Sequence, residues 1–173
     1  FKPGDHVILS FYSDGTCDNC LKGVPTQCRS YAKYNLSGVR ADGDDHFTEN
    51  GKHVSDMFNQ SSFTTTTVVD QRNAVKVDSK LDLRKLGPLG CGYVTGSGTV
   101  FNTLKPKPGD TIAVFGTGAV GLAAMMAGRI SGCIKVIAVD IVPERLELAK
   151  ELGATHAINS KEEDPVEKIK ELT

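Results

Sequence analysis

Three of the chain's five cysteines lie in one short polar loop, residues 14–28, which reads D-G-T-C-D-N-C-L-K-G-V-P-T-Q-C. Two residues separate Cys17 from Cys20, and seven separate Cys20 from Cys28. Because the chain shows no secretory signal pattern, clustered cysteines favour a metal site over disulfides. A structural zinc ion takes four ligands in a closed tetrahedron, so the three thiols require one further ligand.

Asp14 is the candidate for the fourth ligand. It precedes Cys17 by three residues, the same step that separates Cys17 from Cys20, and carboxylate oxygen is an acceptable zinc ligand. Asp18 competes for the role, although it adjoins Cys17 and its side chain would have to point back on itself. The alternative is a metal-free loop, in which three thiols would be exposed to oxidation. We therefore predict a structural zinc site of Asp14, Cys17, Cys20 and Cys28.

A second pattern, formed by Gly116, Gly118 and Gly121, is typical of a nucleotide-binding loop. The glycines make a G-x-G-x-x-G motif between an apolar run, T-I-A-V-F, and a run of good helix formers, L-A-A-M-M-A-G-R. The first glycine permits a tight turn, the second lets a pyrophosphate approach the backbone, and the third lets the helix pack against the strand. The anion would lie at the helix N-terminus, where free N–H groups and the helix dipole favour it.

Asp140 indicates which dinucleotide the loop would take. It ends the next expected strand, 19 residues after Gly121. A carboxylate at this point accepts hydrogen bonds from the ribose hydroxyls and repels a 2′-phosphate, so we predict NAD rather than NADP. The alternative is a glycine-rich turn without a ligand, followed by a solvated aspartate.

The elements that position these groups change in character near residue 80. Before it, β-branched and aromatic residues predict strands at 5–12, 64–69 and 73–77. After it, residues 93–104 are expected to be helical, and apolar strands then alternate with helices to the end of the chain. Such alternation is typical of an α/β fold with a parallel sheet.

The composition narrows the classes of function. The 173 residues carry a net charge of −1, which gives no electrostatic case for nucleic acid or an anionic membrane as a partner. No apolar run approaches the roughly 20 residues of a membrane span, and no signal peptide pattern begins the chain, so we expect a cytoplasmic protein. The chain starts without methionine in a strand-like segment and stops on a helical pattern, and we therefore expect an internal segment of a longer protein.

Four segments resemble, in this order, those of the zinc-dependent medium-chain alcohol dehydrogenases: the cysteine loop, L-G-C-G-Y-V-T-G-S-G-T-V, A-V-F-G-T-G-A-V-G-L and V-I-A-V-D-I. The resemblance covers essentially the whole chain, and N-Q-S-S-F at 59–63 is most similar to the aryl (benzyl) alcohol dehydrogenase branch. It implies an α/β protein in which residues 1–88 are part of a GroES-like β catalytic domain with a structural-zinc lobe. Residues 89–173 would form the first half of a Rossmann doubly wound parallel sheet. Asp14 departs from the family's usual four cysteines.

The resemblance also implies a second, catalytic zinc. Cys91, in L-G-C-G, matches one ligand of that zinc, whereas its residue type and glycine neighbours alone favour a small buried side chain. The other two ligands match nothing in this chain and are expected before Phe1. All the histidines fall outside the family's ligand motif, and we expect surface or strand roles for them: His6, His46, His53 and His156.

Five further positions match the family one by one. Thr95 and Val120 match residues that flank the nicotinamide, and Arg145 matches a basic residue near the adenosine ribose. Met57 and Phe58 match substrate-pocket positions, although two adjacent apolar residues are equally consistent with plain core.

The implied function is the zinc- and NAD-dependent oxidation of a primary, aromatic alcohol to its aldehyde by hydride transfer to NAD. Zinc would polarise the alcohol oxygen and lower its pKa, while the hydride chemistry belongs to the cofactor. The partners would be a small-molecule alcohol or aldehyde and further copies of the same chain, as a homo-oligomer (a dimer or tetramer). With one of three catalytic-zinc ligands, the 173-residue chain alone is expected to be inactive.

Two other functions stay open on the sequence. The chain can be a non-catalytic module that combines a zinc lobe with half a nucleotide fold, or a zinc-free relative similar to quinone reductases. The cysteine loop and Cys91 argue against the second function. The zinc content of the chain discriminates, because a zinc-free relative would bind none.

Overall fold

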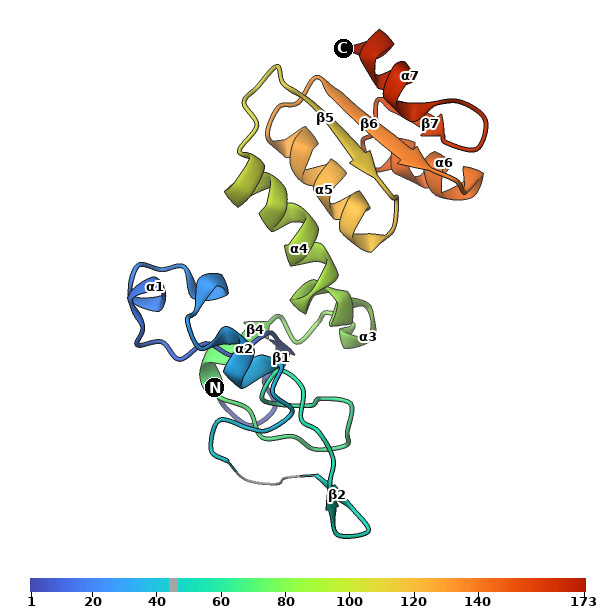
Figure 1. The fold of residues 1–173 in the computed structure, drawn as a ribbon. Helices are drawn as coiled ribbons and strands as arrows, with labels where there is room; N and C mark the ends of the chain where they lie inside the picture. The colour runs from blue at the N-terminus through green and yellow to red at the C-terminus, as the bar shows by residue number, and fades with distance from the viewer. Residues whose placement is uncertain (44–46) are drawn as a thin grey trace. The chain divides into compact units, whose positions relative to one another are not determined.

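The computed structural model describes residues 1–43 and 47–173, so the predicted surface or strand role of His46 lies outside the described residues. The chain falls into two compact units, Phe1–Gly90 and Cys91–Thr173, which we call the N-terminal and C-terminal units. The N-terminal unit consists mostly of loops and short elements, whereas the C-terminal unit alternates strands and helices (Figure 1). In the described part of the chain, no helix combines the length and apolar character that crossing a membrane requires.

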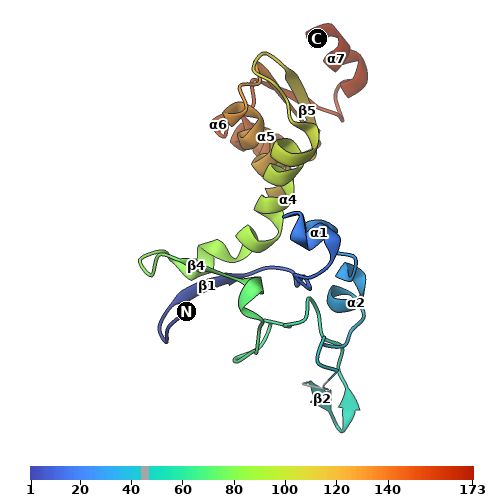
Figure 2. The same cartoon turned by 90° about the vertical axis from the view of Figure 1, so that its left-hand side faces the viewer.

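The described residues of the N-terminal unit form two small antiparallel sheets. Strand β1 (His6–Leu9) pairs with β4 (Ala74–Val77), and the second pair is a hairpin of β2 (Thr48–Glu49) and β3 (Lys52–His53). Figure 2 shows β1 and β4 running side by side. Short helices fill the connections: α1 (Asp18–Leu21), α2 (Tyr31–Asn35), α3 (Leu83–Leu86) and the 3-10 turns η1 (Pro25–Gln27), η2 (Gln71–Asn73) and η3 (Gly87–Gly90).

The strand predicted at 64–69 is wrong, and the one predicted at 5–12 is shorter than expected. The β-branched run T-T-T-T-V-V has suitable strand propensity, but in the described part of the chain it has no ladder partner, because β4 pairs with β1. A strand needs a partner strand as well as propensity. Instead, the hydroxyl of Thr67 donates a hydrogen bond to the carbonyl oxygen of Gln60. The strand predicted at 73–77 is confirmed as β4.

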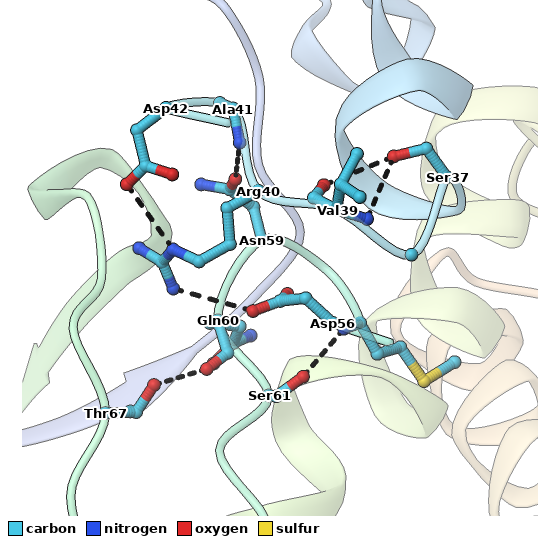
Figure 3. A network of polar contacts seen from close by, with 12 residues as sticks. Ser37, Val39, Arg40, Ala41, Asp42, Asp56, Asn59, Gln60, Ser61 and Thr67 are labelled. Carbon is cyan, nitrogen blue, oxygen red and sulfur yellow. Dashed lines mark hydrogen bonds and ion pairs between the residues drawn. The ribbon is translucent and has the colours of Figure 1, made fainter. Parts of the chain in front are cut away.

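A buried ion pair lies within the N-terminal unit (Figure 3). The side chains of Arg40 and Asp56 are 6% and 2% exposed, and Arg40 Nη1 lies 3.7 Å from Asp56 Oδ2. Asp42 Oδ2 lies 3.6 Å from Arg40 Nε on the same guanidinium. Nearby, Gln60 Nε2 donates a 3.0 Å hydrogen bond to the Ser10 carbonyl oxygen. Buried polar contacts thus tie together loops that are far apart in the sequence.

The C-terminal unit is built on a three-stranded parallel sheet. Its strands β5 (Thr111–Phe115), β6 (Lys135–Asp140) and β7 (His156–Asn159) lie in the order β5-β6-β7. The helices are α4 (Gly92–Gly98), which continues as the π-helix η4 (Thr99–Leu104), then α5 (Ala119–Ile130), α6 (Pro143–Glu151) and α7 (Pro165–Leu172). The predicted helical stretch at 93–104 and the predicted parallel α/β fold are both confirmed.

Helices cover both faces of this sheet because alternate side chains of β6 point to opposite sides. Val136 and Ala138 pack with residues of α5 and α6, including Met125 and Leu146. The residues between them belong to a second cluster that α7 covers: Ile137, Val139, Ile158, Ile169 and Leu172. Burial on both faces explains why the parallel strands appear in the sequence as continuous apolar runs. The result is the first half of a doubly wound sheet.

The helix boundaries follow local signals in the sequence. Pro143 occupies the first turn of α6, where its missing N–H costs no hydrogen bond. Gly153, just after α6, has φ +115°, a conformation that other residues rarely adopt. Asp164 caps α7 by accepting hydrogen bonds from the backbone N–H groups of Val166 and Glu167, at 2.8 and 3.2 Å.

Gly121 allows the first turn of α5 to lie directly against the end of β5. A Cβ atom at this position would lie 1.9 Å from the Gly116 carbonyl oxygen and 3.3 Å from a methyl carbon of Val114. Gly116 itself has φ +92° and turns the chain from strand to helix. The loop geometry therefore requires glycine at these two positions for steric reasons.

We expect Gly121→Ala to destabilise the C-terminal unit by about 1–3 kcal/mol or more, because the backbone must move to make room for the new methyl group. Gly118→Ala is the matched control, since Gly118 has φ −76° and nothing within 4 Å of an added Cβ atom. Urea unfolding of the two variants measures the difference. Equal unfolding free energies would contradict the close packing at Gly121.

Candidate metal and nucleotide sites

The predicted zinc ligands lie together in the N-terminal unit. One ligand atom from each of Asp14, Cys17, Cys20 and Cys28 lies within 4.8 Å of the others, and within residues 1–43 and 47–173 this is the one group of its kind. Short turns bring the thiols together: α1 starts directly after Cys17 and contains Cys20. The 3-10 turn Pro25–Gln27 then ends at Cys28, whose N–H donates to the Pro25 carbonyl oxygen at 3.0 Å.

Asp14 is held in place by the backbone of the same loop. Its Oδ1 accepts hydrogen bonds from the N–H groups of Cys17 and Thr16, at 2.9 and 2.8 Å. These bonds stabilise the ionised form and hold the pKa of the Asp14 carboxyl well below its usual range. The backbone N–H of Asp14 also points to Cys28 Sγ, at 3.5 Å. One carboxylate oxygen of Asp14 lies among the three sulfur atoms, where it can ligate a metal.

Asp18, the competing candidate, is occupied elsewhere. Its carboxylate forms a two-point contact with Arg29, in which Arg29 Nη2 donates to Asp18 Oδ2 at 2.7 Å and Nε donates to Oδ1. This contact lowers the pKa of Asp18 and raises the pKa of Arg29. The structure therefore brings Asp14, and not Asp18, into the cysteine cluster.

The donor set fits zinc in both spacing and chemistry. Tetrahedral Zn–S bonds of about 2.3 Å place neighbouring ligand atoms roughly 3.8 Å apart, which agrees with a cluster whose atoms lie within 4.8 Å of one another. Burial, and then the neighbouring Cys17 thiol, raise the pKa of Cys20 to about 12. Deprotonation of such a thiol at neutral pH needs a cation beside it, and a coordinated metal ion supplies that charge.

Cys91 belongs to the C-terminal unit. It immediately precedes α4 in the C-terminal unit and is exposed, so the small buried role that its residue type favours does not apply. The groups of potential metal ligands found among the described residues do not include Cys91. Its role as a ligand stays a prediction that the family resemblance implies.

Asp140 and the glycine loop meet at the carboxyl ends of β5 and β6. Thr117, between Gly116 and Gly118, donates two hydrogen bonds to Asp140 Oδ2, one from its backbone N–H and one from its hydroxyl, each 2.7 Å long. The N–H groups of Ile141 and Val142 donate to Asp140 Oδ1, at 2.7 and 3.0 Å.

These hydrogen bonds stabilise the ionised form of Asp140. The two from Thr117 contribute most, and together the bonds lower the pKa of Asp140 to about 2 despite its burial. In the G-x-G-x-x-G pattern, Thr117 occupies a variable position and carries no predicted role. The signal that can identify it is a hydroxyl residue between the first two glycines together with an acid at the end of the next strand.

The residues expected beside the nicotinamide lie on two packed helices. Thr95 is exposed on α4, and Val120 is 46% exposed in the first turn of α5. Between them, α4 approaches so closely that a Cβ atom at Gly96 would lie 2.0 Å from the Val120 carbonyl oxygen. Arg145 is exposed in the first turn of α6, directly after the Asp140 loop.

Met57 and Phe58 lie in an unusual turn of the N-terminal unit. Phe58, Asn59 and Ser61 have φ values of 55°, 59° and 46°, which non-glycine residues adopt at a cost. A hydrogen bond of 2.7 Å from the Met57 N–H to Ser61 Oγ helps to hold the turn. Met57 is 57% exposed in this chain, so it is not plain core.

Comparison with known proteins identifies the family. Residues 119–173 match the model of the family described as zinc-binding dehydrogenases. Similarity to named dehydrogenases extends over 99% of the chain, beyond the segment that the model covers. The chain thus matches the zinc-binding dehydrogenase family over residues 119–173 and named dehydrogenases over nearly its whole length, which confirms the resemblance seen in the sequence.

Individual relatives are similar over the whole chain. The chain is 45% identical to the geraniol dehydrogenase of Castellaniella defragrans, over 99% of this chain and 47% of that protein. It also matches the crystal structure of an alcohol dehydrogenase zinc-binding domain protein from Burkholderia ambifaria, with a TM-score of 0.92 and 47% identity, over 100% of this chain and 47% of that one. The structure of benzyl alcohol dehydrogenase from Acinetobacter calcoaceticus gives a TM-score of 0.90 and 45% identity over the same shares. The chain thus spans about half the length of these relatives, and their structures confirm the predicted fold class.

We expect acid to remove the stability that the Asp140 hydrogen bonds contribute. The folded-state pKa of about 2 lies below the ordinary aspartate value, so the contribution is present above about pH 4 and disappears as the pH falls toward 2. Asp140→Asn does not titrate. The difference in unfolding free energy between wild type and Asp140→Asn should therefore shrink from pH 5 to pH 2, as urea unfolding at several pH values can measure. A difference that stays constant over this range would contradict the lowered pKa.

Proposed function

We propose that the natural protein is a zinc- and NAD-dependent alcohol dehydrogenase that oxidises a primary alcohol to its aldehyde. The observation that carries this proposal is the similarity, along the whole chain, to a solved benzyl alcohol dehydrogenase. The chain is also similar to a protein named geraniol dehydrogenase. Benzyl alcohol and geraniol are both primary alcohols with an unsaturated carbon next to the reacting CH₂OH group. We propose that the substrate is a primary alcohol of this class, and most specifically an aromatic alcohol.

The proposed zinc sites have different tasks. Asp14, Cys17, Cys20 and Cys28 would hold a structural zinc, because they form a four-ligand group with a suitable donor set. Cys91 would be one ligand of a catalytic zinc, which when bound polarises the alcohol oxygen and lowers the pKa of the alcohol. The exposure of Cys91 in this chain supports a role other than packing.

The proposed NAD site follows the edge of the parallel sheet. The first turn of α5 would bind the pyrophosphate through its free N–H groups. Gly116 and Gly118 leave open space beside this turn, while Gly121 lets the helix pack against β5. The ionised Asp140 would face the adenosine ribose and repel a 2′-phosphate.

Side chains on the neighbouring elements would complete the pocket. We propose that Arg145 lies near the adenosine ribose and that Thr95 and Val120 flank the nicotinamide. Met57 and Phe58 would contact the alcohol. The exposure of Met57 and its fixed, left-handed turn support a contact role. We further propose that the natural protein is a cytoplasmic homo-oligomer without a nucleic-acid partner.

If Asp14 is a ligand of the structural zinc, variants at position 14 should differ in their zinc affinity in a defined order. Asp14→Ala should lower the zinc affinity at least about tenfold, because loss of a residue that merely orients a ligand already costs that much. Asp14→Cys should bind zinc as tightly as wild type or more tightly. Asp18→Asn is the matched control, because Asp18 contacts Arg29 rather than the cluster. Competition with a chromophoric chelator measures the affinities. If Asp14→Ala binds zinc as the control does, Asp14 is not a ligand.

The catalytic role of Cys91 is tested in the whole natural protein. Cys91→Ser should lower NAD-dependent oxidation of benzyl alcohol at least about a thousandfold, because the several kcal/mol that a metal contributes to the transition state would be lost. Zinc analysis should then find about one ion fewer per chain. The cluster around Cys28, which does not include Cys91, should keep its zinc. A wild-type protein that contains zinc but oxidises neither benzyl alcohol nor geraniol would sink the proposed function, and a zinc-free one would favour a quinone reductase-like relative.

A further inference from the structure

Donors from the described residues fill all the acceptor positions of the Asp140 carboxylate. Two carboxylate oxygens offer about four lone-pair sites between them. Thr117 fills two of these sites on Oδ2, and the N–H groups of Ile141 and Val142 fill two on Oδ1. A ribose hydroxyl that donates to Asp140 must therefore replace one of the four donors.

The four donors differ in how easily they can leave. Three are backbone N–H groups, whose directions are set by the loops after β5 and β6, and moving them would require both loops to change. The fourth is the hydroxyl of Thr117, which can turn away by rotation about single bonds while the backbone stays in place. The rotamer of Asp140 would remain fixed by the three N–H groups. The hydroxyl is therefore the donor that a ligand can displace at the lowest cost.

Burial shows that Thr117 acts through Asp140. The Thr117 residue is 1% exposed and cannot present its hydroxyl to a ligand. Asp140 is also buried, but it keeps 9% of its surface exposed at the end of β6. Burying a carboxylate without enough donors is costly, so a fourth donor keeps the side chain satisfied when no ligand is bound.

We propose that the Thr117 hydroxyl occupies, on Asp140 Oδ2, the acceptor position that a hydroxyl of the adenosine ribose takes when NAD binds. The inference rests on the proposed NAD site at the glycine loop. Thr117 is then a built-in competitor of the cofactor: it stabilises the empty protein, weakens NAD binding and favours release of the bound dinucleotide. Its effect should be confined to ligands that carry the adenosine ribose.

The test compares Thr117→Val, which replaces the hydroxyl with a methyl group of similar size, with Thr117→Ser, which keeps the hydroxyl. Both are prepared in the whole natural protein and titrated with NAD and with nicotinamide mononucleotide, which lacks the adenosine ribose. We expect Thr117→Val to bind NAD about three- to tenfold more tightly than wild type, the range expected for removing one competing hydrogen bond. Thr117→Ser should bind NAD as wild type does, and neither substitution should change binding of the mononucleotide.

Two results with Thr117→Val would overturn the proposal. Unchanged or weaker NAD binding by Thr117→Val would overturn the proposal, since a purely structural role for the hydroxyl predicts loss of affinity. A gain that extends equally to nicotinamide mononucleotide would also overturn it. If Thr117→Val does not fold, Thr117→Ala removes the same hydroxyl and should give the same direction. A wild-type protein that does not bind NAD contradicts the proposed function itself, which separates that failure from failure of this inference.

Discussion

The C-terminal unit depends on the hydrogen bonds that Asp140 accepts. One carboxylate joins the loop after β5, through Thr117, to the loop after β6, through Ile141 and Val142. Both loops are therefore held at the same edge of the parallel sheet, where ligands of such sheets bind. Because the four bonds favour the ionised form, the edge carries a permanent negative charge at neutral pH. The same bonds that build the loop thus define the charge that a dinucleotide would meet.

The N-terminal unit uses a different principle, in which polar groups take the place of a large apolar core. Arg40 is buried against Asp56, and the cysteine loop collects four potential ligand atoms within short turns. A metal ion at such a cluster contributes its binding free energy directly to folding. If the proposed structural zinc is bound, the lobe is therefore expected to depend on it for its structure.

Much of the fold can be predicted from the sequence, and the exceptions have a common cause. The helices and parallel strands after residue 105 follow from periodicity, apolar runs and caps such as Pro143 and Asp164, which act within a few residues. The strand predicted at 64–69 is wrong because strand formation also needs a partner, and β1 pairs with β4 instead. Propensity is local, whereas pairing depends on where distant segments lie.

The sequence by itself indicated the family, through the resemblance of four segments. It also predicted the alternation of the parallel sheet and the residues that can serve as ligands, because apolar runs and the spacing of residues within a loop are local features. The tertiary structure decided which of two aspartates joins the cysteines, since Arg29 engages Asp18 from eleven residues away. It also decided that Thr117 shares the carboxylate of Asp140, a contact across 23 residues. Contacts of this kind depend on how separate strands and loops come together in space, and no local pattern of residues specifies that.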